Sequence, residues 1–329
     1  MYKMKKTSCA IIIYSYESFQ FLKTCIRQAR KFKHPDIEQR IIVSEQSKNV
    51  NEYNRVVAEF GNDSDVTIVH MKALFSGYSI DYILRYVPIE SEFVCTMDVD
   101  AFAISPSWLS MPITLLQEDN FSFTGGLACH AEGSETIYPP SPFYWMSQFF
   151  TVGRLRDFMN LSLNGGFTKF HQRPNIDVPM QFLNNDWADW AGHVDGENYW
   201  HRGSDDGTVA HFWADKYTNN NKLALSISHI IGSPTDGSSY GRILDGLVFH
   251  FGYCYTSIGV EEHMGKNFNS WKAKINEDFN DEVVNDLVNL ALQSPCEVLS
   301  RSIWDGKLKK GIPLTKELTE KIEKLKCGY

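Results

Sequence analysis

Short apolar runs alternate with stretches of helical periodicity through the first hundred residues. This alternation is the feature that most restricts the fold classes open to the chain. The strand-like runs are 8–14, 40–45, 66–70 and 93–97, and the helix-like stretches are 18–33, 51–60 and 76–86. Strands separated by helices form parallel sheets with helices on both faces. The sequence therefore predicts an α/β fold with a doubly wound, mostly parallel sheet.

Two aspartates, Asp98 and Asp100, end the fourth apolar run, within the stretch EFVCTMDVDAFAI at 92–104. Side chains at i and i+2 of a strand share a face, so both carboxylates are expected to point into the space beyond the strand. Two such carboxylates repel each other unless a cation joins them, and oxygen ligands suit Mg²⁺ or Mn²⁺. Solvated turn aspartates are the alternative explanation. The apolar residues that follow favour the metal site, because they would hold the loop against the protein.

The segment from Phe75 to Leu109 resembles the donor site of GT-A glycosyltransferases. It contains a helix, a strand, the Asp-x-Asp pair and the continuation AFAISPSWL. The resemblance extends from about Thr7 to about Gly259. It implies a GT-A fold, which is Rossmann-like with a mostly parallel central sheet flanked by helices. It also implies that Asp98 and Asp100 contact the metal and the diphosphate of a nucleotide-sugar donor, UDP- or GDP-linked.

A nucleotide pocket is expected where the strands end, since doubly wound sheets bind ligands beyond the carboxyl ends of their strands. The residues at such positions are Tyr14, Ser15, Tyr16, Glu45, Ser76 and Gly77. The resemblance implies that these positions contact the base and the ribose. Each one alone is also an ordinary turn residue, so the assignment depends on their common location.

Residues 184–215 are dense in carboxylates, histidines and tryptophans. Ser204-Asp205-Asp206 has the pattern of a helix start, with a capping residue and acids in the first turn. Inverting GT-A enzymes carry their general base at such a helix start, and the resemblance implies that role for Asp205 or Asp206. The carboxylate would remove the acceptor's proton as its oxygen attacks the anomeric carbon. Alternatives for the base are Asp186, Asp189 and Asp195.

The apolar run GLVFHFGYCY at 246–255 has a strand pattern and contains His250. A single histidine among aromatic residues is usually a core or rim residue. GT-A enzymes, however, often take a further metal ligand from a histidine well C-terminal to the Asp-x-Asp pair. The resemblance therefore implies this role for His250, with His229 and His263 as alternatives. A neutral imidazole suits Mn²⁺ better than Mg²⁺.

The sequence pattern changes near residue 270, where charged amphipathic stretches begin. Residues 1–270 are predicted to form the catalytic domain, with a nucleotide-sugar-binding half at 1–110 and an acceptor-binding half at 111–270. Charged amphipathic patterns predict a C-terminal helical extension at 271–329.

Within the acceptor half, the segment 129–150 contains Pro139, Pro140 and Pro142 among aromatic residues. Proline interrupts both helices and strands. We therefore predict no regular element in this segment.

Charge and cysteine content limit the partners and the compartment. The net charge of −8 argues against a general affinity for nucleic acid. A basic cluster at 27–33 still leaves room for a modified DNA base as the acceptor. The seven cysteines are scattered and lack the CxxC spacing of a zinc site, which favours reduced thiols in the cytoplasm. No apolar stretch approaches the ~20 residues that span a bilayer.

Three functions compete for this pattern. Phosphatases of the haloacid dehalogenase type also place Asp-x-Asp after a strand, but near the chain start and followed by Thr or Val. A non-catalytic carbohydrate-binding protein on a transferase fold would not need both aspartates. We therefore predict a metal-dependent hexosyl- or pentosyltransferase that acts with inversion, because a base can be named and no covalent nucleophile can. The acceptor would be a hydroxyl of a glycan or of a hydroxymethylated DNA base.

Overall fold

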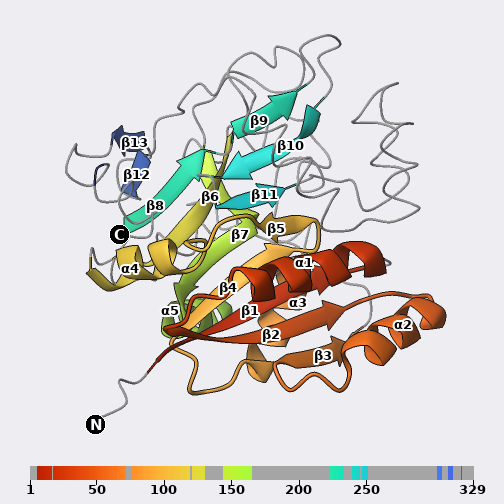
Figure 1. The fold of residues 1–329 in the computed structure, drawn as a ribbon. Helices are drawn as coiled ribbons and strands as arrows, with labels where there is room; N and C mark the ends of the chain where they lie inside the picture. The colour runs from red at the N-terminus through yellow and green to blue at the C-terminus, as the bar shows by residue number, and fades with distance from the viewer. Residues whose placement is uncertain are drawn as a thin grey trace, which may run out of the picture.

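The computed structural model describes the part of the chain that contains most of the predicted donor site. The described residues are 6–16, 18–71, 76–118, 121–129, 144–164, 222–227, 229–232, 239–244, 247–250, 302–305, 310–313 and 320. They form a nine-stranded main sheet and a four-stranded second sheet, with helices packed against them (Figure 1). None of the described helices is long and apolar enough to cross a membrane.

Four parallel strands linked by helices form one half of the main sheet. The strands are β1 (Thr7–Ser15), β2 (Ile37–Glu45), β3 (Val66–His70) and β4 (Phe93–Asp98). The connecting elements are α1 (Phe19–Lys31), α2 (Val50–Phe60), α3 (Ser76–Ile83) and the 3₁₀ helix η1 (Leu84–Tyr86). The strand order is β3-β2-β1-β4, and every neighbouring pair is parallel. The predicted alternation of strands and helices is confirmed.

The other half of the main sheet is mixed. It contains β7 (Tyr144–Arg154), β6 (Phe123–Cys129), β8 (Lys222–Ile227), β12 (Ser302–Asp305) and β13 (Lys310–Pro313), in that order after β4. Strands β7 and β12 run opposite to the other strands of the sheet. Helices α4 (Ser110–Glu118) and α5 (Leu155–Asn164) flank it. The fold is therefore α/β, with a mixed, mostly parallel sheet between helices, as the sequence predicts.

Alternate side chains of β1 belong to two separate apolar cores. Cys9, Ile11 and Ile13 pack in the core that includes α1, α2 and α4. Ala10 and Ile12 pack in the core that includes α3 and α5. Because helices cover both faces, β1 is buried from Cys9 to its end.

The second sheet is antiparallel and begins directly after β4. Its strands are β5 (Ala101–Ala103), β11 (Val248–His250), β10 (Ser239–Leu244) and β9 (His229–Gly232), in that order. Only Val99 and Asp100 separate β4 from β5, so the chain passes from one sheet to the other at the Asp-x-Asp pair. This passage brings β11 beside the predicted metal ligands.

One prediction about regular structure is corrected, and two strands are found within the predicted C-terminal extension, whose helices stay a prediction. Strand β7 begins at Tyr144, inside the segment predicted to have no regular element. The three prolines precede the strand, and aromatic residues of high strand propensity follow them. Strands β12 and β13 lie inside the predicted helical extension and add to the main sheet beyond β8. The helices predicted on either side of these strands lie almost entirely outside the described residues.

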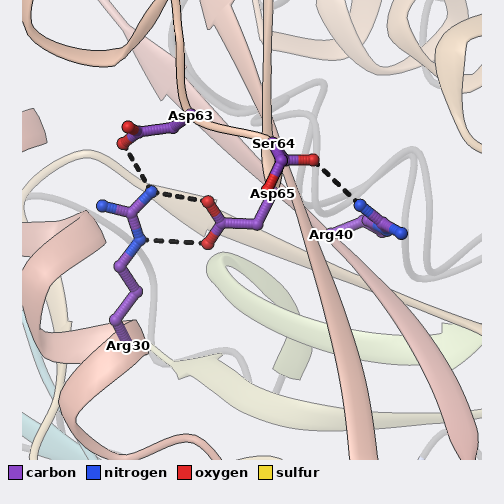
Figure 2. A network of polar contacts seen from close by, with 5 residues as sticks. All are labelled: Arg30, Arg40, Asp63, Ser64 and Asp65. Atoms are coloured by element: carbon purple, nitrogen blue, oxygen red, sulfur yellow. Dashed lines mark hydrogen bonds and ion pairs between the residues drawn. The ribbon is translucent and has the colours of Figure 1, made fainter.

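A network of polar contacts joins the end of α1 to the turn before β3 (Figure 2). Arg30 donates two hydrogen bonds to the carboxylate of Asp65, at 2.7 and 3.0 Å, and one to Asp63 at 2.6 Å. Arg40 of β2 donates to the backbone carbonyl of Ser64 at 2.9 Å. The Arg30 hydrogen bond lowers the pKa of Asp65. The network lies at the amino ends of the parallel strands, so it braces the end of the sheet opposite Asp98.

Candidate metal centre

Side chains from both sheets meet where β4 ends. Asp98 is the last residue of β4, Asp100 lies in the turn before β5, and His250 is the last described residue of β11. His250 pairs with Ala101 across the second sheet, which places it one residue from Asp100. Its Nε2 atom is 3.3 Å from Oδ1 of Asp100 and 3.6 Å from Oδ2 of Asp98. One ligand atom from each residue lies within 4.8 Å of the other two.

The burial of this cluster is uneven. Asp100 is fully buried, and neither of its carboxylate oxygens has a hydrogen-bond partner in the described part of the chain. His250 is 9% exposed, whereas the side chain of Asp98 keeps 34% of its surface exposed. Burying a carboxylate without hydrogen bonds costs free energy unless a cation or a donor compensates for it. Asp100 and His250 therefore form the buried side of the cluster, and Asp98 forms the side that is exposed to solvent.

The donor atoms fit a divalent cation. Two carboxylates and one imidazole are a mixed oxygen and nitrogen set, which suits Mn²⁺ and also accommodates Mg²⁺. The unpartnered oxygens of Asp100 are the kind of buried polar atoms that a bound cation satisfies. Three protein ligands leave positions for oxygens of a substrate.

Cys25 of helix α1 lies near the cluster, close enough for the carboxylates of Asp100 and Asp98 to act on its thiol. Burial raises the pKa of the Cys25 thiol, and the carboxylates of Asp100 and Asp98 raise it further. The thiol therefore stays protonated at neutral pH and adds no charge to the site.

Phe149 of β7 lies against the candidate ligand His250. The two rings are stacked with centroids 4.4 Å apart and planes 2° apart. Phe149 is not among the residues that the sequence predicts for the site, because the prolines before it predict no regular element in this part of the chain. The aromatic run YWMSQFF was the available signal for a strand.

The predicted nucleotide residues of β1 and β2 lie together at the carboxyl ends of the parallel strands. Tyr14 is in register with Asp98, and Ser15 is in register with Glu45. Glu45 is fully buried. Its Oε1 atom accepts a hydrogen bond from the backbone N–H of Ser47 at 2.9 Å. Its Oε2 atom has no hydrogen-bond partner among the described residues.

For the other predicted nucleotide residues, the structure gives the position of the backbone. Tyr16 follows β1 directly, and its backbone N–H donates to Oγ of Ser18 at 3.3 Å. Ser76 and Gly77 form the first turn of α3, which packs against β1 and β2.

The candidate general bases lie outside the described residues. These are Asp205 and Asp206, together with the alternatives Asp186, Asp189 and Asp195. Of the alternative metal ligands, His263 also lies outside, and the backbone of His229 lies on β9. The structure thus describes the donor side of the predicted site and not its acceptor side.

Comparison with protein-family models gives no match, and comparison with curated proteins gives none either. Solved structures do match parts of the chain. The mannosyltransferase PcManGT from Pyrobaculum calidifontis, in complex with GDP-Man and Mn²⁺, is 13% identical with a TM-score of 0.38, over 50% of this chain and 48% of that one. Glucosyl-3-phosphoglycerate synthase from Mycobacterium tuberculosis is 12% identical with a TM-score of 0.35, over 47% and 59%.

A third match is 4-diphosphocytidyl-2C-methyl-D-erythritol synthase from Anaerococcus prevotii. It is 14% identical with a TM-score of 0.39, over 56% of this chain and 85% of that one. This chain spans about half the length of the mannosyltransferase that it matches. With TM-scores this low, the similarities do not carry a functional assignment, which has to come from the geometry of the site.

Proposed function

We propose that this protein is a metal-dependent glycosyltransferase that moves a sugar from a nucleotide-sugar donor to a hydroxyl acceptor. The observation that supports the proposal is the meeting of Asp98, Asp100 and His250 beyond the end of β4. The buried oxygens of Asp100 have no hydrogen-bond partner among the described residues, and the side chain of Asp98 is partly exposed. Such a site can bind a cation and still admit a substrate from one side.

The three side chains have distinct roles in this proposal. Asp100 and His250 would hold Mn²⁺ or Mg²⁺ from the buried side, and Asp98 would hold it from the exposed side. The bound cation would neutralise charge on the departing nucleoside diphosphate.

Glu45 supports a UDP- or GDP-linked donor. Its buried Oε2 atom is an acceptor without a described partner, so a ligand satisfies it by presenting an N–H group. Uracil has an N–H at position 3, and guanine has N–H groups at position 1 and on its exocyclic amine. Adenine and cytosine can donate only from their exocyclic amines, and the unprotonated ring nitrogen beside each amine makes them a poorer match for a buried carboxylate than uracil or guanine. The proposed donor is therefore a uridine or guanosine diphosphate sugar.

The acceptor side of the reaction stays a prediction from the sequence. In it, Asp205 or Asp206 removes the proton of the acceptor hydroxyl, and the sugar is transferred with inversion. The acceptor is a glycan or a hydroxymethylated DNA base, and the reaction takes place in the cytoplasm.

A thermal-shift screen tests the proposal. The purified protein is heated with UDP-, GDP-, CMP- and ADP-sugars in Mn²⁺, in Mg²⁺ or in EDTA, because a ligand that binds the native state raises the Tm. We expect a shift with a UDP- or GDP-sugar that needs the metal and disappears in Asp100→Asn. The control is Asp36→Asn, which removes an exposed carboxylate far from the site and should keep the shift. No shift with any donor, or a shift of equal size in EDTA, would contradict the proposal.

A further inference from the structure

The imidazole of His250 is oriented in an unusual way for a metal ligand. Its Nε2 atom faces Asp98 and Asp100, while its buried Nδ1 atom has no hydrogen-bond partner among the residues the structure describes. Histidines that bind metals nearly always donate their second N–H to a carbonyl, a carboxylate or a water, and this bond fixes the ring. Among the described residues, a contact other than a hydrogen bond therefore holds the ring of His250 in its plane.

Phe149 supplies that contact. Its ring lies parallel to the imidazole, within 2° and with centroids 4.4 Å apart, and it is only 3% exposed. A parallel contact this close blocks rotation of the imidazole out of its plane. In that plane, Nε2 points at the two carboxylates.

Phe149 lies in a bulge of β7, and its side chain contacts His250 of the second sheet. Gly125 of β6 pairs with Thr151 of β7, but the next residue, Gly126, pairs with Ser147. Residues 148–150 of β7 therefore have no partner on β6, and Phe149 is the central one. Bulges of this kind bend a strand and redirect its side chains.

Gly125 makes the bulge possible. Its φ of +150° is a conformation that other residues rarely adopt. A Cβ atom at this position would lie 2.3 Å from the backbone oxygen of Phe150 and 2.9 Å from Cα of Thr151. Only glycine therefore lets β6 lie this close to the bulged part of β7.

We infer that Phe149, held by the bulge and by Gly125, is a positioning residue that keeps His250 in place as a metal ligand. The inference rests on the proposed function, since it concerns the same metal site. It adds a specific consequence. Because the imidazole favours Mn²⁺ over Mg²⁺, the orientation of His250 sets the preference of the site for Mn²⁺.

The test measures Mn²⁺ and Mg²⁺ affinities of the full chain by calorimetry, without nucleotide. Phe149→Leu removes the flat ring and keeps an apolar side chain. We expect it to weaken Mn²⁺ binding about tenfold, at the lower end of the effects seen when a ligand loses its outer support. Mg²⁺ binding should weaken less, so the ratio of the two affinities falls toward that of His250→Ala. Phe149→Tyr keeps the ring and should keep the ratio.

Phe150→Leu is the matched control. Phe150 is the next residue in β7 and is fully buried, but its ring contacts Trp108 instead of His250. The Phe150→Leu variant loses the same apolar volume as Phe149→Leu and should leave the ratio of Mn²⁺ to Mg²⁺ affinity unchanged. If Phe149→Leu does not fold, Phe149→Met replaces it, because the flexible methionine fills the space without a flat ring.

The outcomes show whether the positioning role of Phe149 fails alone or together with the metal site. An unchanged metal preference in the Phe149 variant, or an equal loss in Phe149→Leu and Phe150→Leu, would overturn the positioning role, while loss of binding in His250→Ala would still support the metal site. A wild-type protein that binds neither metal would overturn both.

Discussion

The apo protein should become more stable when the charge of Asp100 is removed. The carboxylate is fully buried, and its oxygens have no hydrogen-bond partner in the described part of the chain. Asn has nearly the same shape and carries no charge. Asp100→Asn should therefore relieve an unfavourable interaction that the protein keeps in order to bind a cation.

The size of the effect follows from burial and chain length. A buried polar group without a partner costs about 1–3 kcal/mol. With roughly 2.1 cal/mol/K of unfolding entropy per residue, 329 residues give about 0.7 kcal/mol/K. We therefore expect the Tm of Asp100→Asn to rise by about 1–4 °C in EDTA. For the wild type, Mn²⁺ at a hundred times its Kd should add about 2.7 kcal/mol, and hence about 4 °C.

Calorimetric melting of both proteins, with EDTA and with Mn²⁺, checks this prediction. The variant should melt above the wild type in EDTA and should not respond to Mn²⁺, whereas the wild type should gain enough to close the gap. Asp36→Asn should behave as the wild type in both conditions. A variant that melts below the wild type in EDTA would refute the reasoning, because it would mean that the protein itself satisfies the buried carboxylate.

Three further predictions concern other parts of the molecule. Glu45→Gln should weaken binding of the UDP- or GDP-sugar about tenfold in calorimetry and leave Mn²⁺ affinity unchanged, because it replaces a charged acceptor with a neutral one; unchanged donor affinity would remove Glu45 from the pocket. Asp65→Asn should lower the free energy of unfolding by up to about 1 kcal/mol at pH 7, since its pair with Arg30 is partly exposed. Because Arg30 lowers the pKa of folded Asp65, this difference should be complete above the unfolded pKa of about 4 and shrink as the pH falls below it, and urea titrations at pH 7 and pH 3 would show whether it does. Burial raises the pKa of Cys9 to about 12, so iodoacetamide at pH 8 should modify Cys9 in urea and not in the native protein, and labelling of the native protein would contradict its placement in the core.

Local patterns in the sequence were sufficient for the parallel half of the sheet and for the positions of Asp98 and Glu45 at its carboxyl edge. Strands β1 to β4 are apolar runs bounded by turns, and helical spacing marks the connections between them. Asp98 and Glu45 were placed correctly because side chains at the carboxyl ends of parallel strands gather at one edge of the sheet.

Contacts between distant parts of the chain could not be predicted in the same way. The local sequence does not distinguish His250 from a core histidine, and only the pairing of β11 with β5 brings it to Asp100. The stack of Phe149 on His250 depends on a bulge whose only local trace is a glycine pair on a different strand. Strands β12 and β13 have four residues each, too few for a periodic pattern. Strand β12 forms by pairing with β8, and β13 forms by pairing with β12.

The most direct test of the account is a crystal structure with Mn²⁺ and UDP or GDP, recorded with anomalous data at the manganese edge. We predict one anomalous peak coordinated by Asp98, Asp100 and Nε2 of His250, in contact with the diphosphate, and a base whose N–H group meets Oε2 of Glu45. Manganese bound elsewhere, or a nucleotide bound away from these side chains, would contradict the proposed function.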